Sequence, residues 1–360
     1  MQKKDIIDIL DRLTLPGEGQ SISQSGAITN INIFGQEVII DLTMKTPALH
    51  IKKRVVSDIT KALQDAFGAE VTPTINIKVP PAPAQGPQLI KGKPIKGIQN
   101  IVAVASGKGG VGKSTVTANL AITLAEMGFK VGVLDADIYG PSVAMMLGVP
   151  ESTRPDSPDG RSFIPVPAHG LETMSMAYLV SDKTPMAWRG PMAGGALQQL
   201  LEQTHWGELD ILVVDMPPGT GDIQLTLAQK AAVAGAVIVT TPQDIALLDA
   251  RKGIEMFAKV KIPVLGIVEN MAVHICSNCG HEDAIFGAGG GDSVAAEYHT
   301  QLLGSMPLDR TIRERGDSGT PSVVAEPDGD IAQRYRVVAA KVIEQLAAMD
   351  DSSGPEIVFE

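Results

Sequence analysis

The octapeptide at residues 107–114, Gly-Lys-Gly-Gly-Val-Gly-Lys-Ser, limits the possible folds of this chain more than any other stretch. It fits the pattern G-x-x-x-x-G-K-[ST], in which glycines let successive backbone N–H groups turn toward a phosphate. An apolar run, Ile101–Ala105, precedes it, and a segment with helical character, Thr115–Met127, follows it. This order of strand, loop and helix favours a phosphate site at a helix N-terminus over an ordinary glycine turn. We expect Lys113 to contact the β- and γ-phosphates and Ser114 to help hold Mg²⁺.

Length and composition set outer limits on the function. At 360 residues the chain exceeds what one hydrophobic core usually covers, so we expect two unequal domains. The formal charge of −11 argues against nucleic acid or an anionic membrane as a main partner, because both require a basic surface. No apolar run approaches the roughly 20 residues of a membrane span, and the start, Met1–Asp5, lacks a signal-peptide core. We therefore expect a soluble, cytoplasmic protein.

Residues 1–79 are predicted to form a small α+β domain. Helical spacing and strand alternation of apolar residues indicate two helices and three strands, the first two strands being joined as a hairpin. A proline-rich run, Pro80–Pro87, then opens an extended and semi-rigid linker over residues 80–97. The expected elements are helices Asp5–Leu13 and Lys52–Phe67 and strands Ala27–Ile33, Val38–Met44 and Thr74–Val79.

Residues 98–350 alternate between strand and helix patterns, which predicts an α/β domain with a parallel sheet and helices on both faces. Most of the strands are continuous apolar runs, as expected when both faces are covered. The last helix is expected at Asp330–Ala348, and an acidic tail, residues 351–360, follows. The predicted strands are Ile98–Ala105, Lys130–Asp135, Leu171–Ser175, Asp210–Asp215, Ala236–Thr241, Pro263–Glu269 and Gln301–Pro307.

Three of these strands end in acidic or polar segments, namely Asp135–Ser142, Asp215–Asp222 and Glu269–Met271. Ligands of parallel sheets collect at the carboxyl edge, so these ends and the phosphate loop should meet in one crevice. A single aspartate after a strand is equally well explained as a helix cap. Three such ends beside a phosphate loop favour a ligand site.

Four motifs, in this order, carry a resemblance to a known family. They are K-G-G-x-G-K-[ST] at 108–114, D-A-D-x-x-G-P-S at 135–142, D-x-P-P-G-T-G-D at 215–222 and E-N-M-x-x-H-x-C-x-x-C-G-H at 269–281. From about Ile95 to Ala348 the chain closely resembles the Mrp/Nbp35-type (ApbC-like) P-loop ATPases, which have a deviant Walker A loop. Members of that family are iron–sulfur cluster carriers related to nitrogenase iron protein and to the MinD and ParA ATPases.

The resemblance implies roles for the matching residues. Lys108 would cross a dimer interface to the partner's nucleotide, where a second ammonium offsets the charge of phosphoryl transfer. Asp137 would orient the attacking water and, like Asp215, hold Mg²⁺ through water, and Asn270 would contact the adenine edge. The implied catalytic residues are Lys108, Lys113 and Asp137. The implied nucleotide-binding residues are Gly107, Lys108, Gly109, Gly110, Val111, Gly112, Lys113, Ser114, Thr115 and Asn270.

The first domain more weakly resembles the MIP18-like domain that bacterial members of this family often carry. Leu15–Glu18 stands where that domain usually has D-P-E, and Thr46–Leu49 lacks the cysteine that usually follows T-P-A. We therefore expect a docking or regulatory role for this domain rather than metal binding.

Cys276 and Cys279 are the only cysteines of the chain, so disulfides do not stabilise it. Two thiolates at this spacing supply half of a four-coordinate soft-metal site, and a Cys₄ site must take its other half from a second copy. The resemblance implies a labile [4Fe-4S] cluster that bridges two subunits. The alternatives are a structural zinc, to which His274 or His281 could add nitrogen ligands, a thioredoxin-like redox pair, or two inert thiols.

These features predict an ATP-hydrolysing homodimer that uses ATP and Mg²⁺, receives a [4Fe-4S] cluster from an upstream cluster or iron donor, and transfers it to apo iron–sulfur proteins. One alternative is a spatial-organising ATPase of the MinD or ParA kind with a structural zinc at the cysteines. That alternative needs a basic terminus or surface, whereas the last helix is followed by Asp350, Asp351 and the acidic tail. An electron-transfer reductase would share the same motifs.

Overall fold

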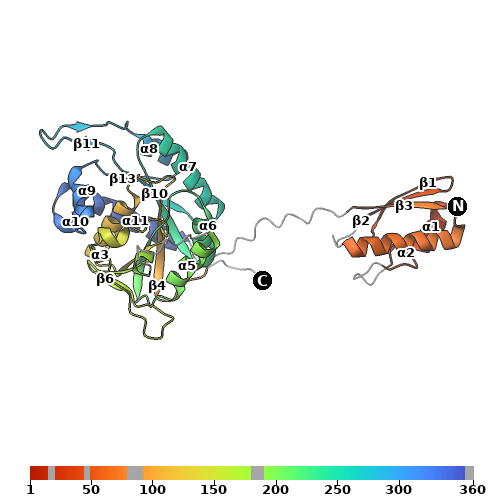
Figure 1. Cartoon of the computed structure of the whole chain (residues 1–360). Coiled ribbons are helices and arrows are strands. Elements are labelled where there is room, and N and C mark those ends of the chain that lie inside the picture. The colour runs from red at the N-terminus through yellow and green to blue at the C-terminus, as the bar shows by residue number, and fades with distance from the viewer. Residues whose placement is uncertain (15–20, 44–48, 79–91, 180–189, 353–360) are drawn as a thin grey trace. The chain divides into compact units, whose positions relative to one another are not determined.

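The computed structural model describes residues 1–14, 21–43, 49–78, 92–179 and 190–352 (Figure 1). The chain divides into two compact units, Met1–Gln88 and Leu89–Glu360. Most of the predicted linker and of the predicted acidic tail lies outside the described residues, as do Leu15–Glu18 and most of Thr46–Leu49. The domain boundaries expected at residues 79, 97 and 350 therefore stay predictions.

The first unit packs two helices on a three-stranded sheet of order β1-β2-β3 (Figure 1). β1 (Ile28–Phe34) and β2 (Glu37–Thr43) are antiparallel, whereas β3 (Thr72–Lys78) runs parallel to β2 after the crossover helix α2 (Leu49–Phe67). α1 (Lys3–Leu10) begins and ends earlier than predicted. Alternate residues of β2 enter the core, as the period of a strand requires. The buried core includes Ile6, Leu10, Val38, Ile40, Leu42, Val55, Ile59 and Leu63.

An eight-stranded sheet of order β13-β10-β9-β4-β8-β5-β7-β6 forms the centre of the second unit. Its neighbours pair in parallel, with the exception of β6 and β7, which are antiparallel. The strands are β4 (Ile98–Ala105), β5 (Val131–Asp135), β6 (Val166–Ala168), β7 (Leu171–Ser175), β8 (Leu209–Asp215), β9 (Val233–Thr240), β10 (Val264–Glu269) and β13 (Leu302–Ser305).

All seven predicted strands are present, and the predicted fold class, a parallel α/β sheet preceded by a small α+β domain, is confirmed. The prediction of an all-parallel sheet is wrong in one detail. The sheet has an additional strand, β6, which pairs antiparallel with β7 at one edge. This strand holds three residues, Val166–Ala168, which is too short to show a period of two.

Helices cover both faces of the sheet and enclose two separate cores. Along β4, Ile101, Ala103 and Ala105 enter one core and Val102 and Val104 enter the other, which is why the strand is apolar throughout. Helices α3, α10 and α11 bury side chains in one core and α5, α6, α7 and α8 in the other. The helices are α3 (Lys113–Glu126), α4 (Val143–Met146), a 3-10 turn (Met176–Tyr178), α5 (Gly190–Glu202), α6 (Asp222–Lys230), α7 (Asp244–Lys259), α8 (Gly290–Glu297), α9 (Arg310–Asp317), α10 (Ser322–Ala325) and α11 (Asp330–Ser352).

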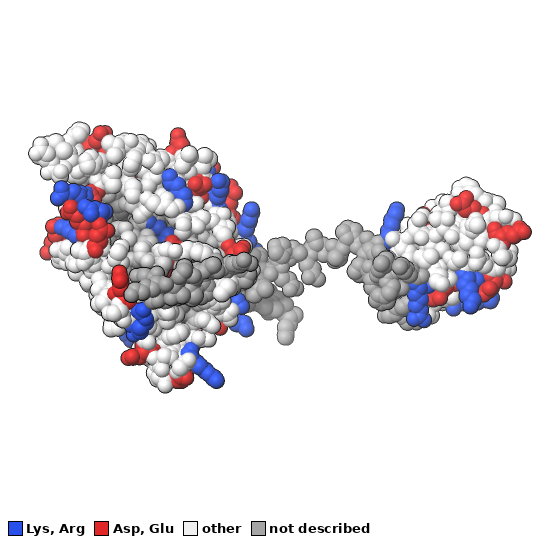
Figure 2. All heavy atoms as spheres, in the orientation of Figure 1, with Lys and Arg blue, Asp and Glu red and all other residues white. Residues whose placement is uncertain are grey.

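The surface carries charges of both signs. Basic and acidic side chains lie interspersed on the face shown in Figure 2. Among the described residues, no helix has both the length and the apolar character needed to cross a bilayer.

Candidate functional site

The phosphate loop leaves the carboxyl end of β4 and runs into α3, whose first residue is Lys113. Gly110 and Gly112 have φ values of +82° and +83°, a region that favours glycine because it has no Cβ. A Cβ on Gly107 would lie 2.1 Å from the backbone of Asp249. The loop therefore needs glycine for backbone conformation at two positions and for close packing at a third.

Six of the predicted nucleotide-binding residues line one cavity of about 200 Å³. Asp137 and Pro218 border the same cavity, so the predicted convergence of the phosphate loop with two other strand ends is present. The six residues are Gly109, Gly110, Gly112, Lys113, Ser114 and Thr115.

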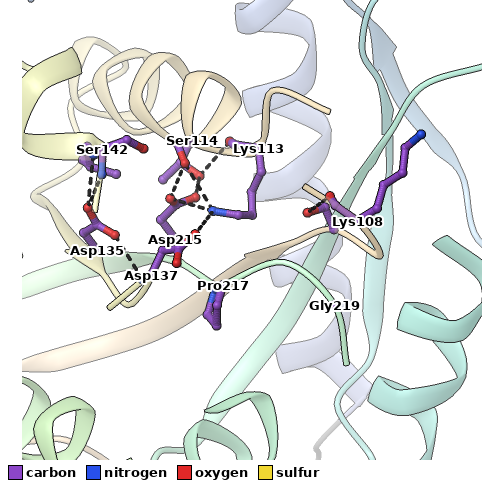
Figure 3. Close-up of polar contacts among 12 residues, drawn as sticks. Lys108, Lys113, Ser114, Asp135, Asp137, Ser142, Asp215, Pro217 and Gly219 are labelled. Carbon is purple, nitrogen blue, oxygen red and sulfur yellow. Dashed lines mark hydrogen bonds and ion pairs between the residues drawn. The ribbon is translucent and has the colours of Figure 1, made fainter. Parts of the chain in front are cut away.

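Asp215 connects three side chains of α3 to the end of β8 (Figure 3). Its Oδ2 accepts hydrogen bonds from Lys113 Nζ at 2.7 Å and from Ser114 Oγ at 2.6 Å. Its Oδ1 accepts the Thr117 hydroxyl at 2.6 Å. Asp215 is fully buried and Lys113 is 6% exposed, so this ion pair is shielded from solvent. A phosphate would compete with this carboxylate for the Lys113 ammonium, whereas Mg²⁺ would bind the oxygens of Ser114 and Asp215.

Asp137 lies on the other side of Lys113, with its Oδ2 4.0 Å from Lys113 Nζ. Burial raises the pKa of Asp137 above its usual value, and the Lys113 charge opposes that rise. The side chain faces the cluster in Figure 3 and borders the phosphate-loop cavity. Its position therefore suits a group that acts beside the γ-phosphate, the role that the resemblance implies.

Asp135 is a buried residue that the sequence analysis did not single out. Its carboxylate accepts the backbone N–H groups of Asp137, Ser142 and Val143 at 3.0–3.1 Å and the Ser175 hydroxyl at 3.2 Å. Burial, and then the neighbouring Asp215 charge, raise the pKa of Asp135 to about 7. Asp135 thus fixes the loop that carries Asp137. The D-x-D doublet was the available sequence signal.

Lys108 lies in the same loop but points away from the Lys113 cluster (Figure 3). Its Nζ is 3.5 Å from Gln243 Oε1, and its carbonyl accepts the Ser106 hydroxyl at 3.0 Å. The structure of one chain thus separates two of the three predicted catalytic residues, Lys113 and Asp137, from the third. Action of Lys108 on a second subunit stays a prediction.

The segment from Asp215 to Gly221, called here switch II, is held from both sides. Gly219 donates its N–H to the Ser106 carbonyl at 2.9 Å. Gln224 Nε2 donates to the carbonyls of Pro217 and Gly219, both at 2.9 Å. A second cavity, of about 480 Å³, lies between this segment and the loop that carries Asp137. Space is thus available on one side of switch II for a change of its position.

Asn270 follows β10 and is buried against the phosphate loop. Its Nδ2 donates to the Val111 carbonyl at 2.8 Å, and a Cβ on Gly112 would lie 2.1 Å from this nitrogen. The amide nitrogen is therefore used to hold the loop. The implied contact of Asn270 with adenine stays a prediction.

A small hairpin projects from the second unit (Figure 1), and Cys276 and Cys279 lie in the loop that joins its two strands. Its strands, β11 (His274–Ile275) and β12 (Glu282–Asp283), are antiparallel. The Cys276 N–H donates to the His281 carbonyl at 2.9 Å, and the Gly280 N–H donates to the Cys276 carbonyl at 2.8 Å. This tight turn presents both thiols on one short loop.

The Cys276 sulfur accepts hydrogen bonds from neighbouring groups of its own loop. Backbone N–H groups of Asn278 and Cys279, and then the Cys279 thiol, direct hydrogen bonds to it and lower the pKa of the Cys276 thiol. His274 Nδ1 instead lies 3.3 Å from the Leu308 carbonyl. Within the described ranges, no group of three His, Cys, Asp or Glu side chains is placed to hold a metal ion. One chain therefore offers two sulfur ligands.

Comparison with known proteins gives two family matches. The profile described as NUBPL iron-transfer P-loop NTPase matches residues 97–343. The profile described as iron-sulfur cluster assembly protein matches residues 3–73.

Curated relatives are named iron-sulfur cluster carrier protein. The relative from Pseudomonas fragi is 64% identical over 242 residues, which are 67% of this chain and 84% of the relative. The relative from Escherichia coli (strain K12) is 59% identical over 271 residues, 75% of this chain and 73% of the relative. A protein from Synechocystis sp. is 42% identical over 345 residues, which cover 95% of this chain and 97% of that protein.

Solved structures show the same architecture. A nucleotide-binding protein from Archaeoglobus fulgidus, in complex with ADP, has 39% identity and a TM-score of 0.57 over 66% of this chain and 93% of its own. The septum site-determining protein MinD of Pyrococcus horikoshii, complexed with Mg-ADP, has 24% identity and a TM-score of 0.51 over 70% of this chain and 98% of its own. At that identity the MinD match shows the fold alone.

Proposed function

The chain belongs to the family of NUBPL-type iron-transfer P-loop NTPases, and from that membership we propose that two copies of it hydrolyse ATP and carry a labile [4Fe-4S] cluster to apo-proteins. It is a P-loop ATPase of the ParA type. The MinD structures have the same fold. The relatives that span nearly the whole chain are named iron-sulfur cluster carrier protein. Family membership covers the cluster-carrier function, whereas the homodimer, the [4Fe-4S] type of cluster and the coupling of its transfer to ATP hydrolysis are what we propose.

One observation carries the proposal: the unit that holds the phosphate loop also projects a hairpin whose tip bears both cysteines of the chain. Two thiolates are half of the ligand set of a [4Fe-4S] cluster. A second copy of the chain supplies the other two, which places the cargo between subunits. Cys279 is exposed and Cys276 is half-buried, so the hairpin tip is open to an acceptor protein.

The environment of Cys276 suits this cargo. The hydrogen bonds that the sulfur accepts from the following backbone favour the thiolate, which is the form that binds iron. Hydrogen bonds to a cluster sulfur also tune its reduction potential. An interface site made of four separate side chains lets the cargo leave when the subunits part.

Nucleotide chemistry is assigned to four side chains of one chain and to Lys108 of a second copy. Lys113 would bind the β- and γ-phosphates, and Ser114 and Asp215 would hold Mg²⁺, Asp215 through water. When bound, Mg²⁺ neutralises charge that develops on the transferred phosphoryl group. Asp137 orients the attacking water. Lys108 of the second copy adds positive charge beside the γ-phosphate.

The test is anaerobic reconstitution of the full chain with iron and sulfide, followed by visible absorbance, acid-labile sulfide and mass per complex. The wild type should bind one cluster per two chains, and the double variant Cys276→Ala, Cys279→Ala should bind none. Metal without acid-labile sulfide would support the spatial-organising ATPase with structural zinc instead. A strictly monomeric loaded protein would remove the bridging site from the proposal.

A further inference from the structure

The end of strand β10 contacts the phosphate loop and the start of helix α8, into which the cysteine loop, defined here as residues 271–289, returns. Asn270 donates its Nδ2 hydrogen to the Val111 carbonyl at 2.8 Å. The preceding residue, Glu269, accepts the Gly291 N–H on its Oε1 at 2.7 Å. Asn270 and Glu269 are 8% and 4% exposed, so both contacts are buried. Two adjacent side chains therefore link the phosphate loop to the helix that follows the cysteine loop.

Packing makes these contacts tight. A Cβ on Gly112 would lie 2.1 Å from Asn270 Nδ2, and a Cβ on Gly291 would lie 3.0 Å from the Glu269 Cβ. Little room is left for one side to shift while the other stays in place. Interiors packed in this way change between discrete arrangements rather than deform continuously.

The cysteine loop is fixed at both ends. It starts directly after Asn270, where the Ala272 N–H donates to the Met306 carbonyl at 3.0 Å and the Leu308 N–H donates to the Val273 carbonyl at 2.7 Å. It returns into α8, whose second residue is Gly291, the partner of Glu269. A movement of the Glu269–Asn270 dipeptide therefore reaches the hairpin from both of its stems.

We propose that Glu269 and Asn270 are positioning residues that couple nucleotide binding to the two cysteines within a single chain. This inference rests on the proposed function, since it concerns how that nucleotide site regulates that cargo site. Phosphates that bind the backbone of Val111 and Gly112 move Asn270, and Glu269 shifts the start of α8 with it. The exposure of Cys276 and Cys279 then changes with the nucleotide.

This route lies within one chain, whereas the action proposed for Lys108 requires the second subunit. By linkage, it acts in both directions: a metal ion that binds the cysteines alters nucleotide affinity by the same factor by which nucleotide alters the affinity of the cysteines for that metal. Both directions can be measured in the absence of cluster and of acceptor protein.

The chain offers a specific probe, because a thiol reagent can react only at Cys276 and Cys279. Full-length, metal-free protein is alkylated with limiting iodoacetamide, with and without Mg-ADP, and the rate at each cysteine is followed by mass spectrometry. The wild-type rate should change about fivefold or more on addition of nucleotide. In Glu269→Ala, each cysteine should be alkylated at the same rate with and without Mg-ADP. Glu269→Gln keeps an oxygen for the Gly291 N–H and should retain the nucleotide effect.

Asp292→Ala is the matched control, because Asp292 lies in the first turn of the same helix and is exposed. It should behave as the wild type. Thermal unfolding identifies a variant that fails to fold. If Glu269→Ala fails to fold, Glu269→Asp replaces it in the experiment. Glu269→Asp keeps the charge but moves the carboxylate oxygen away from the Gly291 N–H, so it should reduce the effect of nucleotide on the alkylation rate. The inference is overturned if the wild-type alkylation rate does not change on addition of Mg-ADP. It is also overturned if Glu269→Ala shows the same change in rate as the wild type. Reconstitution of the cluster is unaffected by either result, so the two proposals fail separately.

Discussion

The phosphate-loop side and the cysteine side of the second unit are built in opposite ways. Around Lys113, buried side chains are fixed by several short hydrogen bonds each, and Asp215 alone accepts three. At the hairpin tip the chain is exposed, and its internal contacts are backbone hydrogen bonds across a two-residue ladder. A catalytic pocket gains from a preorganised interior, whereas a site that must release its cargo gains from an open one.

The largest effect is expected at the buried ion pair. Lys113→Ala leaves Asp215 charged and buried without its ammonium partner, which should lower the free energy of unfolding by about 3–5 kcal/mol. ATP hydrolysis should fall about 100-fold or more, because the γ-phosphate loses its cation. Steady-state kinetics and chemical denaturation measure the two effects. Lys252→Ala, at an exposed lysine of α7, should change neither; near-normal hydrolysis by Lys113→Ala would contradict the assignment.

The next effect comes from a glycine of the rigid side. Gly112→Ala combines a φ of +83° with a Cβ placed 2.1 Å from Asn270 Nδ2. The backbone strain and the overpacking together should destabilise the protein by about 2–5 kcal/mol. Loss of ADP affinity, measured by calorimetry, should accompany the lower denaturation midpoint. Unchanged stability would mean that Asn270 yields easily, which would weaken the proposed coupling as well.

The smallest effect is expected at the matching glycine of the open side. Gly280 also has a positive φ, +70°, yet a Cβ there would meet nothing within 4 Å. Gly280→Ala should therefore add only about 1 kcal/mol of local strain at the turn. We expect faster loss of the bound cluster, followed by absorbance, with ATP hydrolysis as in the wild type and an unfolding midpoint lowered much less than in Gly112→Ala. An equal loss of stability in the two glycine variants would refute the contrast between the two sides.

The sequence was sufficient for the features that depend on local pattern. Continuous apolar runs predicted the parallel strands because both faces of the sheet are covered, and the octapeptide predicted the loop after β4. β6 was not predicted because a strand of three residues is too short to show a periodic pattern. The hairpin strands β11 and β12 were not predicted for the same reason, since each has two residues.

Contacts between distant segments could not be predicted from one sequence. Thr117 is one turn into α3, and nothing in its neighbourhood indicates that its hydroxyl binds Asp215. The resemblance assigns Asn270 to adenine, which stays a prediction, and it gives no sign that the amide nitrogen binds the Val111 carbonyl. Asp135 and Asp137 are two residues apart and differ in role because one is fully buried and the other is not. The burial of each aspartate depends on how the sheet packs, so it cannot be predicted from the sequence of the motif alone.

The carboxylate of Asp215 occupies the same ammonium and hydroxyl that an incoming phosphate needs, so the pocket carries its own competitor. An incoming anion competes with it for Lys113 and Ser114, and the cost of that competition is the same for a small ion as for a large one. Orthophosphate regains few contacts after that displacement, while a nucleotide triphosphate regains many along the glycine backbone. We therefore expect Asp215 to favour a nucleotide over the abundant small anions of a cell.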